Sequence, residues 1–129
     1  MLRKTKPIGY LITVPADSGP DVIESFTITQ DVVLKKITVN VFDDVDGTAG
    51  IRVLIGSEYT IPDTDQGDGW FTGDNTTLTV EPEDEITKGT TIYIIGQNNH
   101  STLDKHFYIL FEFKYPEKKE VKEDASADN

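Results

Sequence analysis

Four aspartates lie in the longest stretch of the sequence that lacks a strand pattern, residues 62 to 75: Asp63, Asp65, Asp68 and Asp74. Glycines separate them, and flexible loops rich in carboxylate oxygen can bind calcium. Asp and Gly are also ordinary turn formers, because Asp closes turns through its side chain and Gly adopts positive φ. The sequence therefore makes calcium a candidate cofactor of this loop, with turn formation as the simpler interpretation.

Three aromatic residues lie in or near the same loop: Tyr59, Trp70 and Phe71. An exposed aromatic ring can stack on a sugar while neighbouring Asp and Asn side chains bond its hydroxyls, which makes these residues a candidate sugar-binding face. The alternative is that Trp70 plugs the open end of a β-sandwich, with its indole N–H bonded to a loop carbonyl. The plug is the more ordinary role of the two.

The remaining residue types offer little to a catalyst. The chain has no cysteine, which excludes a thiol nucleophile and a cysteine zinc site, and it has two histidines, His100 and His106. Asp104 precedes His106 at a spacing that places both on one side of a strand, but no nucleophile accompanies them. We therefore expect that the protein is not an enzyme.

The elements that must position these residues are strands. From Ile8 to Tyr115, β-branched and aromatic residues alternate with polar ones, and turn clusters interrupt the pattern about every ten residues. The pattern predicts about eight strands, at residues 8–14, 24–30, 34–42, 51–55, 58–61, 76–80, 90–97 and 105–115. We expect an all-β fold, an antiparallel β-sandwich resembling a jelly roll.

The last predicted strand is apolar on both faces. Its inner face is expected to carry Phe107, Ile109, Phe111 and Phe113, and its outer face Tyr108 and Leu110. A strand of this kind is either central and shielded by loops or in contact with another subunit. Four outward apolar residues are therefore candidates for a subunit interface: Tyr93, Ile95, Tyr108 and Leu110.

The ends of the chain differ from this middle region. Residues 1 to 7 are predicted to form a basic arm, which is either a frayed end or a docking segment through Arg3, Lys4 and Lys6. Residues 8 to 115 form the predicted sandwich, and residues 116 to 129 a charged, flexible tail. The start lacks a signal-peptide cleavage site, so we expect no signal peptide and synthesis in the cytoplasm.

The formal net charge of −11 limits the partners. Nucleic acid would meet carboxylates where it needs Lys and Arg, and an anionic membrane surface would be repelled in the same way. We expect neither as a partner.

Several turns in the middle of the chain carry a resemblance to a known group of proteins. They are Gly50-Ile51-Arg52-Val53-Leu54-Ile55-Gly56, Ile61-Pro62, Gly69-Trp70-Phe71-Thr72-Gly73-Asp74-Asn75 and Gly96-Gln97-Asn98-Asn99. Over residues 8 to 115 the chain resembles small β-sandwich proteins from the structural gene modules of tailed viruses of bacteria and archaea. The resemblance implies a virion component such as a head decoration or spike subunit.

The resulting expectation is a non-enzymatic structural protein of the virion, made in the host cytoplasm, that binds other capsid proteins. It would form a homo-oligomer, with a trimer favoured. The alternative is a carbohydrate-binding or adhesion module that uses the aromatic loop.

Overall fold

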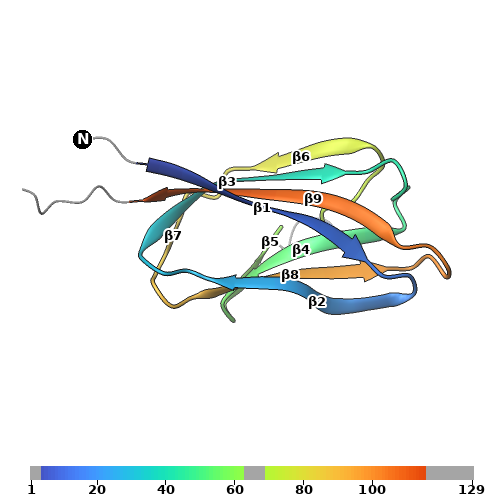
Figure 1. The fold of residues 1–129 in the computed structure, drawn as a ribbon, viewed down its shortest axis with the longest axis horizontal. Coiled ribbons are helices and arrows are strands. Elements are labelled where there is room, and N and C mark those ends of the chain that lie inside the picture. The colour runs from blue at the N-terminus through green and yellow to red at the C-terminus, as the bar shows by residue number, and fades with distance from the viewer. Residues whose placement is uncertain (1–3, 63–68, 116–129) are drawn as a thin grey trace, which may run out of the picture.

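The computed structural model describes residues 4–62 and 69–115, which fold into two antiparallel sheets packed face to face (Figure 1). Within these residues no helix is long and apolar enough to cross a membrane. The described strands are β1 Lys4–Val14, β2 Ser18–Thr27, β3 Val32–Val41, β4 Ala49–Ile55, β5 Tyr59–Ile61, β6 Thr76–Val80, β7 Asp84–Ile86, β8 Thr91–Asn98 and β9 Lys105–Tyr115.

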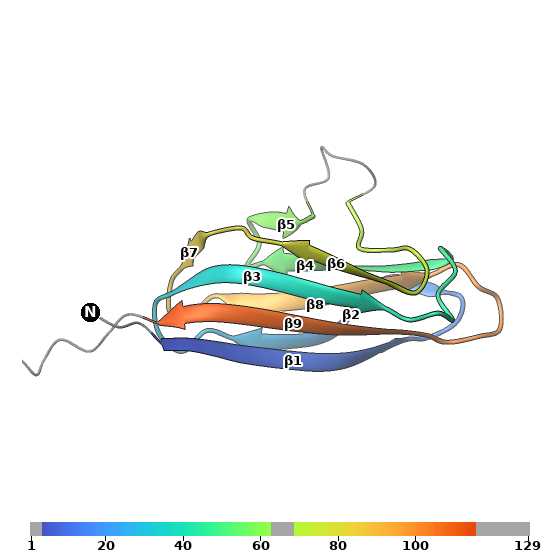
Figure 2. The same ribbon diagram turned by 90° about the horizontal axis from the view of Figure 1, so that it is seen from above.

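The strand order identifies the architecture. Sheet A has the order β1-β9-β3-β6, with the short β7 also paired to β3, and sheet B has the order β2-β8-β4-β5. Apart from β7, this is the order of a jelly roll, two Greek keys folded into two facing sheets. Figure 2 looks onto sheet A with sheet B behind it, and shows β1 and β2 along one side and β5 and β7 along the other. The expected all-β, jelly-roll-like sandwich is confirmed.

The structure moves several predicted strand boundaries, most of all the starts of β1 and β2, and adds one strand. β1 begins at Lys4 rather than residue 8, because residues 4–7 pair with residues 112–115 of β9 and extend the strand into the expected arm. β2 begins at Ser18 rather than residue 24, because an edge strand tolerates Pro20. β7 forms in the stretch 81–89, which was expected to be a connection without a strand, because β3 pairs with it.

The core lies between the sheets and follows the predicted period of two. The inward side chains of β9 are fully buried, as are those of β3 at Ile37 and Val39. Phe26 of β2 reaches across from sheet B, and its ring meets that of Phe111 edge to face at 5.2 Å. Phe26 also stacks on Tyr10 of β1 at 5.7 Å, so one ring joins both sheets at the β1–β2 side.

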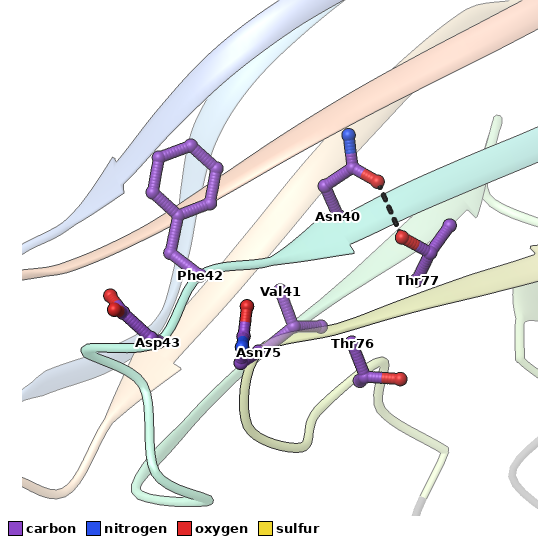
Figure 3. A pocket seen from close by; sticks show the side chains of 7 residues that line it. All are labelled: Asn40, Val41, Phe42, Asp43, Asn75, Thr76 and Thr77. Atoms are coloured by element: carbon purple, nitrogen blue, oxygen red, sulfur yellow. Dashed lines mark hydrogen bonds between the residues drawn. The ribbon is translucent and has the colours of Figure 1, made fainter.

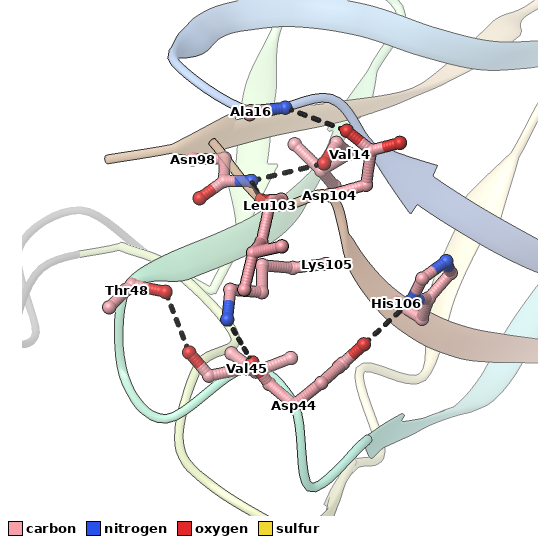
Figure 4. A network of polar contacts seen from close by, with 10 residues as sticks. All are labelled: Val14, Ala16, Asp44, Val45, Thr48, Asn98, Leu103, Asp104, Lys105 and His106. Carbon is pink, nitrogen blue, oxygen red and sulfur yellow. Dashed lines mark hydrogen bonds and ion pairs between the residues drawn. The ribbon is translucent and has the colours of Figure 1, made fainter. Parts of the chain in front are cut away.

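A polar network closes one end of the sandwich (Figure 4). Asn98 is 1% exposed, and its amide nitrogen donates to the carbonyls of Val14 and Leu103 at 3.1 and 2.9 Å. The buried ammonium of Lys105 donates to the backbone carbonyl of Asp44. These bonds satisfy polar groups that would otherwise be costly to bury, and they tie together the end of β1 and the β3–β4 and β8–β9 loops.

Candidate functional site

The structure separates the three residues of the expected sugar-binding face. Phe71 is 3% exposed and belongs to the core, because its backbone pairs with Ile51 on the part of β4 that β5 does not cover. Two backbone hydrogen bonds hold it there, at 2.7 and 3.0 Å. Since a buried ring cannot stack on a sugar, the assignment of Phe71 to such a face is wrong.

Trp70 points the opposite way, onto the outer face of sheet B. Its side chain lies over Gly50, where an added Cβ would come within 3.1 Å of the Trp70 Cβ atom. The guanidinium of Arg52 stacks on the indole, with 4.1 Å from its central carbon to the ring centroid. A cation–π contact of this kind occupies one face of the ring. Trp70 therefore covers β4 at Gly50, which has no side chain of its own, and does not plug the end of the sandwich.

Tyr59 lies at the β5–β7 side of the sandwich. Its hydroxyl donates to Asp84 Oδ2 at 2.9 Å, which links β5 of sheet B to β7 of sheet A. Burial raises the pKa of Tyr59 well above its usual range, and the hydrogen bond and charge of Asp84 raise it further. Tyr59 thus links the two sheets through its hydrogen bond to Asp84, and it does not share a face with Trp70.

The calcium interpretation falls largely on residues that the structure does not describe. Asp63, Asp65 and Asp68 lie outside the described residues, and Asp74 is exposed. Within the described ranges no three His, Asp or Glu side chains gather as metal ligands would. Calcium at this loop stays a prediction.

The four apolar residues expected at one interface lie on two opposite faces. Tyr93 and Ile95 of β8 alternate with buried residues and face outward from sheet B. Tyr108 and Leu110 of β9 do the same on sheet A. A single patch built from all four does not form, because β8 and β9 are neighbours in sequence but belong to different sheets. The molecule instead has one pair of half-buried apolar side chains on the outer face of each sheet.

The outer face of sheet A continues onto β1. Tyr108 lies across Gly9, where an added Cβ would be 2.0 Å from the tyrosine hydroxyl oxygen. Leu11 pairs with Tyr108 in the register of β1 and β9, and its side chain is 66% exposed. Of the basic residues expected to dock, Lys6 is exposed on β1, Lys4 begins that strand, and Arg3 lies outside the described residues.

A groove that the sequence did not suggest lies where β3 ends and β6 begins (Figure 3). It has a volume of about 640 Å³ and is lined by Asn40, Val41, Phe42, Asp43, Asn75, Thr76 and Thr77. The Phe42 ring is 39% exposed. Thr77 donates to the Asn40 carboxamide oxygen at 2.9 Å, which fixes that side chain at the rim. The groove forms from two segments 35 residues apart in the chain, so no local motif marks it.

His106 lies beside this groove and is held in place by a carboxylate. Its Nδ1 is 2.7 Å from Asp44 Oδ2, and its ring centroid is 6.3 Å from that of Phe42. The other histidine, His100, accepts backbone N–H bonds from Thr102 and Leu103. Asp104 accepts from the backbone N–H of Ala16, so it bonds a turn and not the histidine two residues away. Both histidines therefore have partners that organise loops.

No protein-family model matches the chain, and no curated protein matches it either.

Proposed function

We propose that this protein is a non-enzymatic structural subunit of a virus particle, of the head decoration or spike type, that docks on other shell proteins. The observation that carries the proposal is the pair of outward, half-buried apolar side chains on a central strand of each sheet, Tyr93 and Ile95 on sheet B and Tyr108 and Leu110 on sheet A. Apolar groups on the outside of central strands are typical of surfaces that meet another protein.

The fold is compatible with this role and does not decide it. Jelly rolls recur in viral capsid proteins, in lectins and in cupin enzymes, and function depends on the site that a fold carries. The negative charge supports a protein partner over nucleic acid, since a basic surface on the shell would attract this subunit. Self-association of the docked subunits, with a trimer as the expected order, completes the proposal.

Co-sedimentation tests the docking directly. The purified protein is mixed with particles assembled from the shell protein of the same genome and pelleted, and we expect saturation at a fixed ratio to the shell subunit. Tyr93→Glu and Tyr108→Glu then place the contact, because each puts a charge on one face only. Protein that stays in the supernatant at every ratio contradicts the proposal.

A carbohydrate-binding module is the second candidate, and the groove at Phe42 is the observation that favours it. An exposed ring beside carboxamide and hydroxyl groups is the combination that sugar recognition uses, and the groove has Phe42, Asn40 and Thr77. The site proposed for this function thus moves from the aromatic loop to the end of β3.

A glycan array separates this candidate from the structural role. Binding that Phe42→Ala abolishes and Trp70→Ala preserves supports the groove, because Trp70 lies on the outer face of the other sheet. An array without hits favours the docking subunit.

A further inference from the structure

The free edge of β1 is long and regular. All eleven residues pair with β9 in an unbroken register, without a bulge. Strand β1 is an edge strand of sheet A, and its residues Gly9, Leu11 and Thr13 are exposed. A flat edge strand presents unpaired backbone donors and acceptors, which is a template for pairing with another strand.

The direction of these backbone groups follows from the neighbouring strand. The N–H of Phe42 donates to the carbonyl of His106, so the even-numbered residues of β9 bond toward β3. Because bonding direction alternates along a strand, the odd-numbered residues of β9 bond toward β1. Their partners in the register are the even-numbered residues of β1, such as Tyr10 opposite Ile109.

The backbone groups of Gly9, Leu11 and Thr13 therefore point away from the sheet. Outside the strand pairs, no backbone hydrogen bond among the described residues involves these three. Pro7 fits the same alternation, since a proline in an edge strand is tolerated where its missing N–H would face solvent.

Two prolines lie at equal distances on either side of the centre of this free edge. Pro7 lies four residues before Leu11, and Pro15 lies four residues after it. In an antiparallel pairing of two β1 strands centred on Leu11, Pro7 of one copy meets Pro15 of the other, and the window between them contains no proline. Every residue between the two prolines therefore keeps a backbone N–H that can donate a hydrogen bond across the pairing.

We propose that a second copy of this chain pairs with β1 across a two-fold axis at Leu11, an inference that rests on the self-association in the proposed function. Leu11 lies opposite Leu11 of the partner subunit, and Thr13 opposite Gly9 of the partner subunit. The pairing forms roughly six backbone hydrogen bonds and continues sheet A across the axis. It also removes the most exposed large apolar side chain of the described residues, Leu11, from water.

Charge favours the antiparallel direction. Exposed Lys6 lies near the start of β1, whereas exposed Asp17 and Asp104 lie just beyond its end. The two-fold operation brings the basic end of one strand toward the acidic end of the other. Parallel pairing would bring like charges together.

The contact is small, and it is two-fold. One strand pair with a leucine at its centre buries less area than most stable dimers, so we expect a weak dimer, with a dissociation constant on the order of 10–100 µM. A three-fold contact would have to use another surface, such as the outer face of sheet B.

Sedimentation equilibrium up to about 1 mM protein tests the proposal with three matched variants. Thr13→Pro removes one free donor at the edge, and Leu11→Lys places two like charges at the axis. Leu103→Lys is the control, since Leu103 is 55% exposed and lies in the loop before β9. We expect each β1 variant to weaken the dimer at least about 10-fold and the control to leave it unchanged.

Cysteine cross-linking provides a second measurement, because the chain has no cysteine of its own. Paired residues in an antiparallel ladder have Cα atoms about 5.5 Å apart, within disulfide range. Leu11→Cys should form a covalent dimer under mild oxidation, and Leu103→Cys should not.

The outcomes separate this contact from the proposed function. A wild-type monomer at the highest concentration overturns the pairing. An oligomer that persists in both β1 variants also overturns it, but leaves self-association through another surface standing. Docking on shell particles without the pairing likewise removes only the β1 contact.

Discussion

The two edge strands on one side of the sandwich, β1 and β2, are built in different ways. β1 is regular over its whole length, with small or apolar residues along its free edge. β2 has two register shifts against β8, and it carries Pro20, Asp21 and Glu24. Bulges, proline and charge are the devices that keep an edge from pairing with other chains. Because β1 contains a proline too, Pro7, the difference lies in the bulges and carboxylates, which protect the edge of β2 against association and are absent from β1.

Proline substitution at neighbouring positions of β1 should produce the largest contrast. Ile12 is 2% exposed, and its backbone bonds toward β9, so Ile12→Pro loses a ladder bond and core packing. We expect a loss of about 5 kcal/mol or more, whereas Thr13→Pro should cost about 1 kcal/mol or less. Urea denaturation measures both. Equal losses would show that the bonding alternation assigned to β1 is wrong.

Removal of the ring that joins the two edge strands should have the next largest effect. Phe26→Ala deletes the contacts with Tyr10, Phe111 and Phe113. We expect a loss of about 3 kcal/mol, because a large void opens between the sheets. Phe42→Ala is the matched control, and as its ring is 39% exposed its cost should stay below about 1 kcal/mol. Similar losses in thermal or chemical unfolding would contradict the inward packing of Phe26.

The glycine of the open edge should show a coupling with the tyrosine above it. Gly9→Ala places a Cβ against the Tyr108 hydroxyl and should destabilise the protein by about 1 kcal/mol. In a Tyr108→Ser background the same change should be neutral or stabilising, since alanine is the better strand residue. A double-mutant cycle measured by urea denaturation gives the coupling. A coupling near zero would show that Tyr108 does not rest on Gly9.

Some parts of this fold could be predicted from the sequence and others could not. The strong alternation in residues 34–42 and 105–115 predicted two central strands and their buried faces correctly, because period two translates directly into inside and outside. It could not assign strands to sheets. Tyr93 and Tyr108 were predicted to share a surface, yet the loop between β8 and β9 crosses from one sheet to the other.

The candidate sites depended on pairings that leave no local signal. Phe71 is buried and Trp70 is not, because an isolated bridge to Ile51 sets which of the two neighbours faces inward. The groove at Phe42 arises where two distant segments meet. Composition and spacing revealed the aromatic residues, but only the tertiary contacts show which of them a ligand can reach.

The far side of the sandwich supplies the smallest effect and a contrast with the β1–β2 side. Tyr59 joins the sheets there through one hydrogen bond to Asp84, whereas Tyr10 joins them through ring stacking. At pH 7 we expect Tyr59→Phe to cost about 0.5–1 kcal/mol and Tyr10→Phe to cost less, since phenylalanine preserves the stack.

The stability that the Tyr59 hydroxyl contributes should fall as the pH rises. The pKa of Tyr59 is raised in the fold, mainly by burial and then by Asp84, so the folded state holds the phenol proton more tightly than the unfolded chain does. The resulting stability is fully present below the unfolded pKa of about 10 and is lost as the pH rises above it. The advantage of the wild type over Tyr59→Phe should therefore shrink as the pH rises above about 10 in urea titrations. Because Tyr59 is 37% exposed, solvent keeps the effect small. If the stability difference between the wild type and Tyr59→Phe grew with pH, the hydrogen bond between Tyr59 and Asp84 would be ruled out.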